Sequence, residues 1–224
     1  MRKPLNPLPL LAASAVLALA FLPLAVFNYD AESIICKVGS ILCLLILALN
    51  QRPIFPALVA ALAFSAGGDF LLELRHIGRY GPSVLFLFGL AAFLFAHLCY
   101  IALFAPRPAL GGTPPLRRFG TILIVGMLAL MFVVLWPSLG VLRIPVVLYG
   151  LALSTMGITA QQSYFRGMVA LGGVTFVVSD SLLALQHFHG HFPMQGPLIW
   201  FSYYAAQVLL TMGVLTSDHR QAEY

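Results

Sequence analysis

Three acidic residues lie inside stretches of sequence that are otherwise apolar enough to span a membrane. Asp69 and Glu73 fall in the segment FSAGGDFLLEL, and Asp180 falls in FVVSDSLLAL. A charged side chain near the centre of a bilayer costs about 2.5–3.5 kcal/mol on insertion scales, so such residues usually face a polar cavity, a partner or a substrate. We therefore expect these carboxylates to mark an active site inside a helical membrane bundle.

The first two carboxylates are spaced for acid–base chemistry. Asp69 and Glu73 are four residues apart, so both project from one face of a helix. Mutual repulsion and apolar surroundings favour a protonated carboxyl beside an ionised one, and such a pair can act as general acid and general base. For Glu73 the alternative is a position at the headgroup boundary, paired with Arg75 or Arg79. Asp69 and Asp180 lie deeper, which favours a functional role for both.

Several other polar residues share helix faces with one another. Lys37 lies one turn inside the second apolar stretch and either snorkels to the interface, neutralises an inward carboxylate or binds a lipid phosphate. His97 and Tyr100 are three residues apart, and His97 lies roughly 22 Å along the helix that starts at Pro82. His97 therefore either reaches a deep cavity or, as the favoured alternative, is a buried histidine bonded to another helix.

The last apolar stretch carries Tyr203, Tyr204 and Gln207, in which either tyrosine can pair with the glutamine at helical spacing. Tyrosines near an interface are commonly belt residues, which weakens a functional reading of them. The run His187–His191 contains three imidazoles that could bind zinc. It falls at a helix end and brings no carboxylate, so we expect neither a metal nor an organic cofactor.

Composition identifies the class of protein to which these residues belong. The chain has 224 residues, of which 61% are hydrophobic and 8% charged, against about 25% charged in soluble domains. The sequence therefore predicts an integral, multi-pass membrane protein, with residues 1–224 forming a single membrane-embedded domain. The net charge of +5 comes from scattered basic residues, so no nucleic-acid partner is expected. The three cysteines lie in apolar stretches, and no disulfide is expected.

The hydrophobic pattern predicts an all-α bundle of transmembrane helices, because a helix needs about 20 apolar residues to span a bilayer. The first stretch resembles a signal peptide, but we expect it to be retained as a helix. The glycine pairs Gly67-Gly68 and Gly172-Gly173 are expected to permit close helix packing. A homodimer through glycine-rich faces is compatible with the sequence, although nothing requires one. Eight spans are predicted, at roughly 8–27, 33–50, 53–74, 82–104, 118–137, 141–160, 165–187 and 197–216.

Eight spans place both termini on one side of the membrane. Eight of the twelve lysines and arginines fall on that side, so the positive-inside rule predicts that both termini are cytoplasmic. With this topology Asp69 lies roughly 7–8 Å, and Asp180 roughly 10 Å, from the outer ends of their helices. Lys37, Tyr203 and Tyr204 lie within about two turns of the same outer face. Four helices would thus bring ionisable or hydroxyl groups to one depth.

These motifs together resemble the YhhN family of integral membrane lysoplasmalogenases. The resemblance covers the second to eighth spans in order, and Lys37 falls where the family carries a lysine. The loop after Phe104, which is rich in proline, does not match. The matching pieces are Gly68-Asp69-Phe-Leu-Leu72, Phe93-x-x-Ala96-His97-x-x-Tyr100, Pro145-Val-Val-x-Tyr149, Ser179-Asp180-x-Leu-Leu-Ala184 and Tyr203-Tyr-x-Ala-Gln207.

The resemblance implies hydrolysis of the vinyl ether bond of a lysoplasmalogen to a fatty aldehyde and a glycerophospho-alcohol. It implies that Asp69 and Asp180 form the catalytic centre, in a bacterial inner membrane, with a lysophospholipid and membrane lipids as partners. Lys37 would bind phosphate or tune an aspartate. The remaining residues expected to line or orient the substrate pocket are Glu73, His97, Tyr100, Tyr149, Tyr203, Tyr204 and Gln207.

The same residues leave two other classes of function open. A proton-coupled small-molecule transporter also uses intramembrane carboxylates and histidine, but such transporters usually show an internal repeat, and none is evident here. A zinc-dependent membrane lipid hydrolase would use His97 or the run His187–His191.

Overall fold

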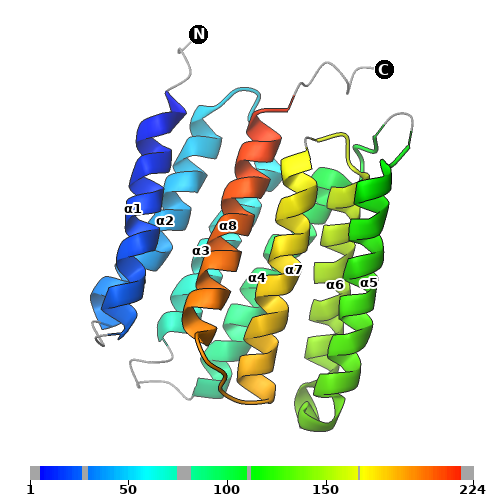
Figure 1. Cartoon of the computed structure of the whole chain (residues 1–224). Coiled ribbons are helices and arrows are strands. Elements are labelled where there is room, and N and C mark those ends of the chain that lie inside the picture. Colours follow the sequence, from blue (N-terminus) through cyan, green and yellow to red (C-terminus); the bar gives the residue numbers. More distant parts are fainter. Residues whose placement is uncertain (1–5, 27–29, 75–81, 110–111, 166, 218–224) are drawn as a thin grey trace. The chain divides into compact units, whose positions relative to one another are not determined.

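The computed structural model describes residues 6–26, 30–74, 82–109, 112–165 and 167–217, and its regular structure there is helical, with no β-strand (Figure 1). This part contains eight helices long and apolar enough to cross a membrane. The prediction of an all-α, multi-pass membrane protein is therefore confirmed, with boundaries displaced by at most three residues. The helices are α1 (Pro7–Val26), α2 (Asp30–Asn50), α3 (Pro56–Leu74), α4 (Pro82–Phe104), α5 (Pro115–Leu135), α6 (Arg143–Gln162), α7 (Gly167–Phe188) and α8 (Gln195–Leu215).

Proline accounts for half of the starts of these eight helices. Four of the helices (α1, α3, α4 and α5) begin at a proline, whose fixed φ suits the first helical position and whose missing N–H would have no intrahelical partner there. Between α5 and α6 the chain makes two short 3₁₀ turns, η2 (Trp136–Ser138) and η3 (Gly140–Leu142). Gly140 has a φ of 49°, a conformation that glycine adopts without steric cost.

The chain divides into two compact units, Met1–Tyr100 and Ile101–Tyr224. In the first unit α1 packs on α2 and α2 packs on α3. Ser14 links the first two of these helices, because its hydroxyl donates a hydrogen bond to the Ser40 carbonyl at 2.8 Å. Gly68 lets α4 approach α3, since a Cβ at that position would lie 2.7 Å from ring carbons of Phe93. The close approach occurs directly beside Asp69.

The prediction of one membrane-embedded domain stays a prediction.

In the second unit consecutive helices run in opposite directions, and α7 lies between α6 and α8 in the order of packing (Figure 1). Glycines again allow the closest approaches. A Cβ at Gly172 would lie 3.0 Å from the backbone nitrogen of Leu210 in α8, and one at Gly173 would lie 3.0 Å from the Cβ of Ala160 in α6. The predicted packing role is thus confirmed for Gly68, Gly172 and Gly173, whereas a Cβ at Gly67 would meet nothing within 4 Å.

The loop from α4 to α5 is fastened to the loop from α6 to α7. The Arg117 guanidinium donates to the backbone carbonyls of Ser163 and Phe165, at 2.7 Å each. The backbone N–H of Ala109 donates to the Gln162 carbonyl at 2.8 Å. Arg117, a basic residue in the first turn of α5, therefore ties the start of that helix to the loop from α6 to α7.

Candidate active site

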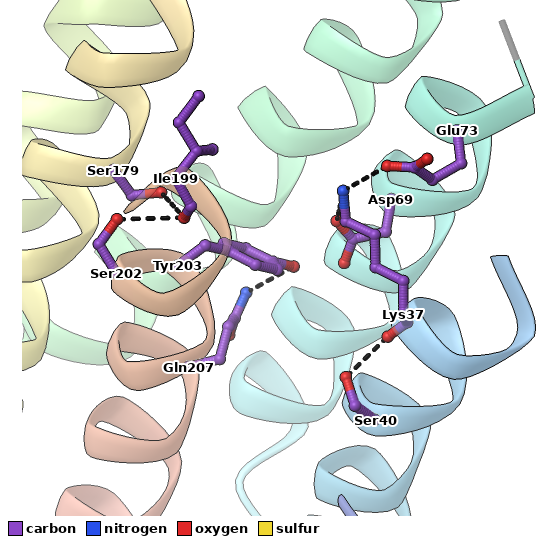
Figure 2. A network of polar contacts seen from close by, with 9 residues as sticks. All are labelled: Lys37, Ser40, Asp69, Glu73, Ser179, Ile199, Ser202, Tyr203 and Gln207. Atoms are coloured by element: carbon purple, nitrogen blue, oxygen red, sulfur yellow. Dashed lines mark hydrogen bonds and ion pairs between the residues drawn. The ribbon is translucent and has the colours of Figure 1, made fainter. Parts of the chain in front are cut away.

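The first unit contains a cluster formed by Lys37, Asp69 and Glu73. The Lys37 ammonium donates a hydrogen bond to Glu73 Oε1 at 2.6 Å and lies 3.9 Å from Asp69 Oδ1 (Figure 2). Of the three roles left open for Lys37, the structure therefore shows neutralisation of inward carboxylates. With both acids ionised the cluster carries one net negative charge, and with one of them protonated it is neutral. Such a group can exchange a proton without leaving an isolated buried charge.

Three helices hold this lysine in place. Because α2 and α3 run in opposite directions, Lys37 near the start of α2 lies opposite Glu73 at the end of α3. The ammonium also lies 5.1 Å from the ring centroid of Phe21 in α1, a cation–π contact. On its own helix, the Ser40 hydroxyl donates to the Lys37 carbonyl at 2.7 Å. The lysine is thus positioned by packing as well as by charge.

Burial distinguishes the two carboxylates. The Asp69 side chain is 2% exposed, whereas Lys37 and Glu73 are 15% and 16% exposed. Glu73 therefore lies nearer the edge of the unit and Asp69 lies deeper, as the sequence predicts. The alternative pairing of Glu73 with Arg75 or Arg79 involves residues outside the described part of the chain.

The second unit contains a pair formed by Tyr149 in α6 and Asp180 in α7. The Tyr149 hydroxyl donates a short hydrogen bond to Asp180 Oδ2, and both side chains are buried. The two helices come together over Gly157, where a Cβ would lie 3.3 Å from the side chain of Val177. The phenol therefore orients the carboxylate on a closely packed scaffold. Only the family resemblance pointed to Tyr149, because a tyrosine in an apolar stretch carries no signal of its own.

A serine beside the aspartate ties α7 to α8. The Ser179 hydroxyl donates to the Ile199 carbonyl at 3.0 Å, and Ser202 donates to the same oxygen at 3.1 Å (Figure 2). The bond from Ser179 joins α7 to α8 next to Asp180, and the bond from Ser202 lies within α8. The sequence offered one signal for this contact, a small polar residue directly preceding the intramembrane aspartate.

Further along α8, the Gln207 amide donates to the Tyr203 hydroxyl at 3.2 Å. Of the two pairings that the spacing allowed, the structure thus shows the one with Tyr203. The Tyr203 ring also packs edge-on against Phe176 of α7, with 5.6 Å between the ring centroids, whereas Tyr204 stacks on Trp200 with 5.9 Å between the centroids. Tyr203 and Gln207 therefore belong to the buried interface of α7 and α8.

The histidines have separate environments. His97 and Tyr100 are fully buried on α4, in the first unit. In the second unit, His191 Nδ1 lies 2.6 Å from the side-chain nitrogen of Gln195. Within the described residues, no group of three or more histidine, cysteine or acidic side chains is arranged to hold a metal ion.

The carboxyl groups that the sequence suggested for chemistry thus fall into two groups of polar side chains. Lys37, Asp69 and Glu73 lie together in the first unit, and Tyr149 contacts Asp180 in the second. Each aspartate is buried, and each is accompanied by one proton-bearing side chain from a neighbouring helix. Both groups contain carboxyl side chains, which can give or accept a proton.

Comparison with known proteins agrees with the resemblance. A Mycobacterium bovis protein named lysoplasmalogenase is 38% identical over 160 residues, which cover 70% of this chain and 59% of that protein. A Rattus norvegicus lysoplasmalogenase TMEM86B is 33% identical over 165 residues, covering 71% of this chain and 62% of its own. A Bos taurus lysoplasmalogenase TMEM86A is 27% identical over 231 residues, covering 96% and 91%.

The matched part of the chain spans about three-fifths of the length of the mycobacterial and rat relatives. No solved structure matches the chain. The model of the YhhN family matches residues 32–214, a segment that contains both aspartates, Lys37 and all the pocket residues expected from the motifs. Because this match covers most of the sequence, the chain belongs to the YhhN family.

Proposed function

We propose that this chain is a membrane hydrolase that cleaves the vinyl ether bond of lysoplasmalogens, the 1-alkenyl-glycerophosphocholines or -ethanolamines. The products are a fatty aldehyde and a glycerophospho-alcohol. The observation that carries the proposal is the burial of Asp69 and Asp180 inside apolar helices, each with its own polar partner. The names of the mycobacterial and mammalian relatives support the substrate class.

The reaction needs only a proton donor, a proton acceptor and water. A proton added to the β-carbon of the vinyl ether leaves an oxocarbenium ion at the α-carbon. Water adds to that carbon and loses a proton, and the resulting hemiacetal breaks its bond to the glycerol oxygen, which takes up a proton. One water is consumed overall. Two carboxyl groups supply these proton transfers in the way that glycosidases use theirs.

We assign the two proton-transfer roles to Asp69 and Asp180. Lys37, which lies 3.9 Å from Asp69 and 2.6 Å from Glu73, is assigned to neutralise these carboxylates or to bind a lipid phosphate. Tyr149 orients Asp180 through its hydroxyl. The residues proposed to line or orient the pocket are Glu73, His97, Tyr100, Tyr203, Tyr204 and Gln207.

The substrate is a lysolipid, so we propose that it enters laterally with its alkenyl chain among the helices and its headgroup near the outer face. The distribution of basic residues supports an orientation with both termini in the cytoplasm, and the family's bacterial branch supports the inner membrane as the location. The basic residues proposed for the cytoplasmic side are Arg2, Lys3, Arg52, Arg107, Arg117, Arg118, Arg166 and Arg220.

The first experiment measures aldehyde released from a lysoplasmalogen by the purified protein in lipid vesicles. An ester lysophospholipid with the same chain and headgroup serves as the control substrate. We expect aldehyde from the vinyl ether and no fatty acid from the ester. Absence of aldehyde from a folded, membrane-inserted protein would reject the proposed function.

The second experiment tests the two carboxylates. Asp69→Asn and Asp180→Asn should each lower kcat by about 10²–10⁴-fold, the usual contribution of a general acid or base. Glu32→Gln is the matched control, because Glu32 is an exposed acid on α2 and should leave kcat unchanged. Near-normal turnover in both aspartate variants, with helical content preserved, would show that the carboxylate mechanism is wrong.

A further inference from the structure

One buried hydroxyl in the first unit is not used by the fold. Ser65 in α3 is 0% exposed, and its Oγ has no hydrogen-bond partner among the described residues. Several other helical hydroxyls of this chain donate to a carbonyl one turn earlier, as Ser181 does to Val177 at 2.7 Å and Thr175 does to Leu171 at 2.9 Å, whereas the buried Thr211 Oγ1 in α8 also has no hydrogen-bond partner among the described residues. Buried polar groups are nearly always hydrogen-bonded in native proteins, so this hydroxyl is available to a partner beyond the described residues.

Ser65 lies on the catalytic face of its helix. It precedes Asp69 by four residues, so the two side chains share one face of α3, with Glu73 a further turn along. Helical Cα–Cβ bonds tilt toward the N-terminus, so the Asp69 carboxylate leans over the turn that contains Ser65. The face therefore presents a neutral hydroxyl, then a deeply buried carboxylate, then the Lys37–Glu73 ion pair.

The reaction proposed above consumes one water molecule inside an otherwise apolar unit. A buried water typically makes about three hydrogen bonds to polar groups. A serine hydroxyl can both donate and accept, and a carboxylate accepts only, so together they offer a water two complementary contacts. Glu73 and Lys37 are less suited to bind this water, because they already form a hydrogen bond with each other at 2.6 Å.

We propose that Ser65 and Asp69 hold the water that hydrolyses the vinyl ether, an assignment that rests on the proposed function. The water oxygen forms the new bond to the oxocarbenium carbon, and the Asp69 carboxylate accepts the proton that the water loses. Lys37, 3.9 Å from Asp69 Oδ1, favours the ionised carboxylate that this step requires. In the proposed function Asp180 then has the remaining role of proton donor, and its Oδ2 accepts the hydrogen bond from Tyr149.

The test compares Ser65→Ala with Ser163→Ala in kcat, KM and unfolding temperature. Ser163 is equally buried, but its hydroxyl donates to the Ala160 carbonyl at 2.9 Å. Ser65→Ala should lower kcat about tenfold, the loss expected for one hydrogen bond, with KM within twofold and the unfolding temperature not lowered. Ser163→Ala should give the opposite pattern, a lower unfolding temperature with kcat unchanged.

The outcomes separate this inference from the proposed function. An inactive wild-type protein would refute the proposed function itself. With an active wild type, a kcat for Ser65→Ala within twofold of wild type would overturn the water site. A raised KM at unchanged kcat would overturn it as well, since it would place Ser65 against the substrate. A lower kcat accompanied by a lower unfolding temperature would show a structural role instead.

Discussion

Removal of the Lys37 ammonium should destabilise the first unit by leaving two carboxylates on one helix face without a cation. Lys37→Met is the suitable change, because methionine keeps most of the apolar stem that packs beneath the charge. At an effective dielectric constant of about 20, the attractions at 2.6 Å to Glu73 and 3.9 Å to Asp69 amount to roughly 6 and roughly 4 kcal/mol. Desolvation offsets much of this attraction, and removing one partner of a buried pair costs about 3–5 kcal/mol.

The exposure of the ion pair selects the lower end of that range. The Lys37 and Glu73 side chains are 15% and 16% exposed, so water partly solvates their charges, and it still partly solvates Glu73 when Lys37 is replaced. We therefore expect Lys37→Met to lower the free energy of unfolding by about 3 kcal/mol. The double variant Lys37→Met/Glu73→Gln leaves only the charge of Asp69 and should recover about 2 kcal/mol relative to the single variant.

The measurement is equilibrium unfolding in mixed micelles of a mild detergent and dodecyl sulfate, for the wild type, both single variants and the double variant. The double-mutant cycle isolates the Lys37–Glu73 coupling from any loss of packing. If the double variant is at least as unstable as Lys37→Met alone, the ion pair does not stabilise the unit and the electrostatic reasoning is refuted.

Two further predictions concern helix contacts. Tyr149→Phe keeps the ring but removes the hydroxyl that orients Asp180. The kcat for aldehyde release should therefore fall about tenfold, with the helical content measured by circular dichroism unchanged. An unaltered kcat would contradict the positioning role. Gly68→Ala places a Cβ 2.7 Å from the Phe93 ring and should cost about 1–3 kcal/mol of unfolding free energy in the same micelle titration. Gly67→Ala, which meets nothing within 4 Å, is the control, and equal losses from both would contradict the packing argument.

The helices could be predicted from the sequence because the bilayer imposes a simple local rule. Each span needs about 20 apolar residues whose backbone groups bond within the helix, so length and hydropathy suffice to locate it. Proline then marked several breaks between spans, as at Pro82 and Pro137. The largest errors were three residues at helix starts: α2 and α5 begin earlier than predicted, at Asp30 and Pro115, and α3 begins later, at Pro56.

The candidate site was only partly predictable. Asp69 and Asp180 stood out because the cost of a charge in an apolar stretch is large and local. The roles of Lys37 and Glu73 stayed open, because snorkelling, pairing and phosphate binding all suit the same position in the sequence. Ser65 passed unnoticed, since serine is common in membrane helices and only its lack of a partner distinguishes it.

The sequence by itself therefore determined the eight spans, the family motifs and the depth of the aspartates along their helices, all of which depend on the order of residues in one segment. Tertiary structure decided which side chains meet. Lys37 bonds to Glu73, 36 residues away, and Tyr149 bonds to Asp180, 31 residues away. Those contacts depend on how neighbouring helices are rotated and how closely glycines let them approach. The rotation of the helices and their distance of approach are set by packing between segments, so they cannot be read from any one segment of the sequence.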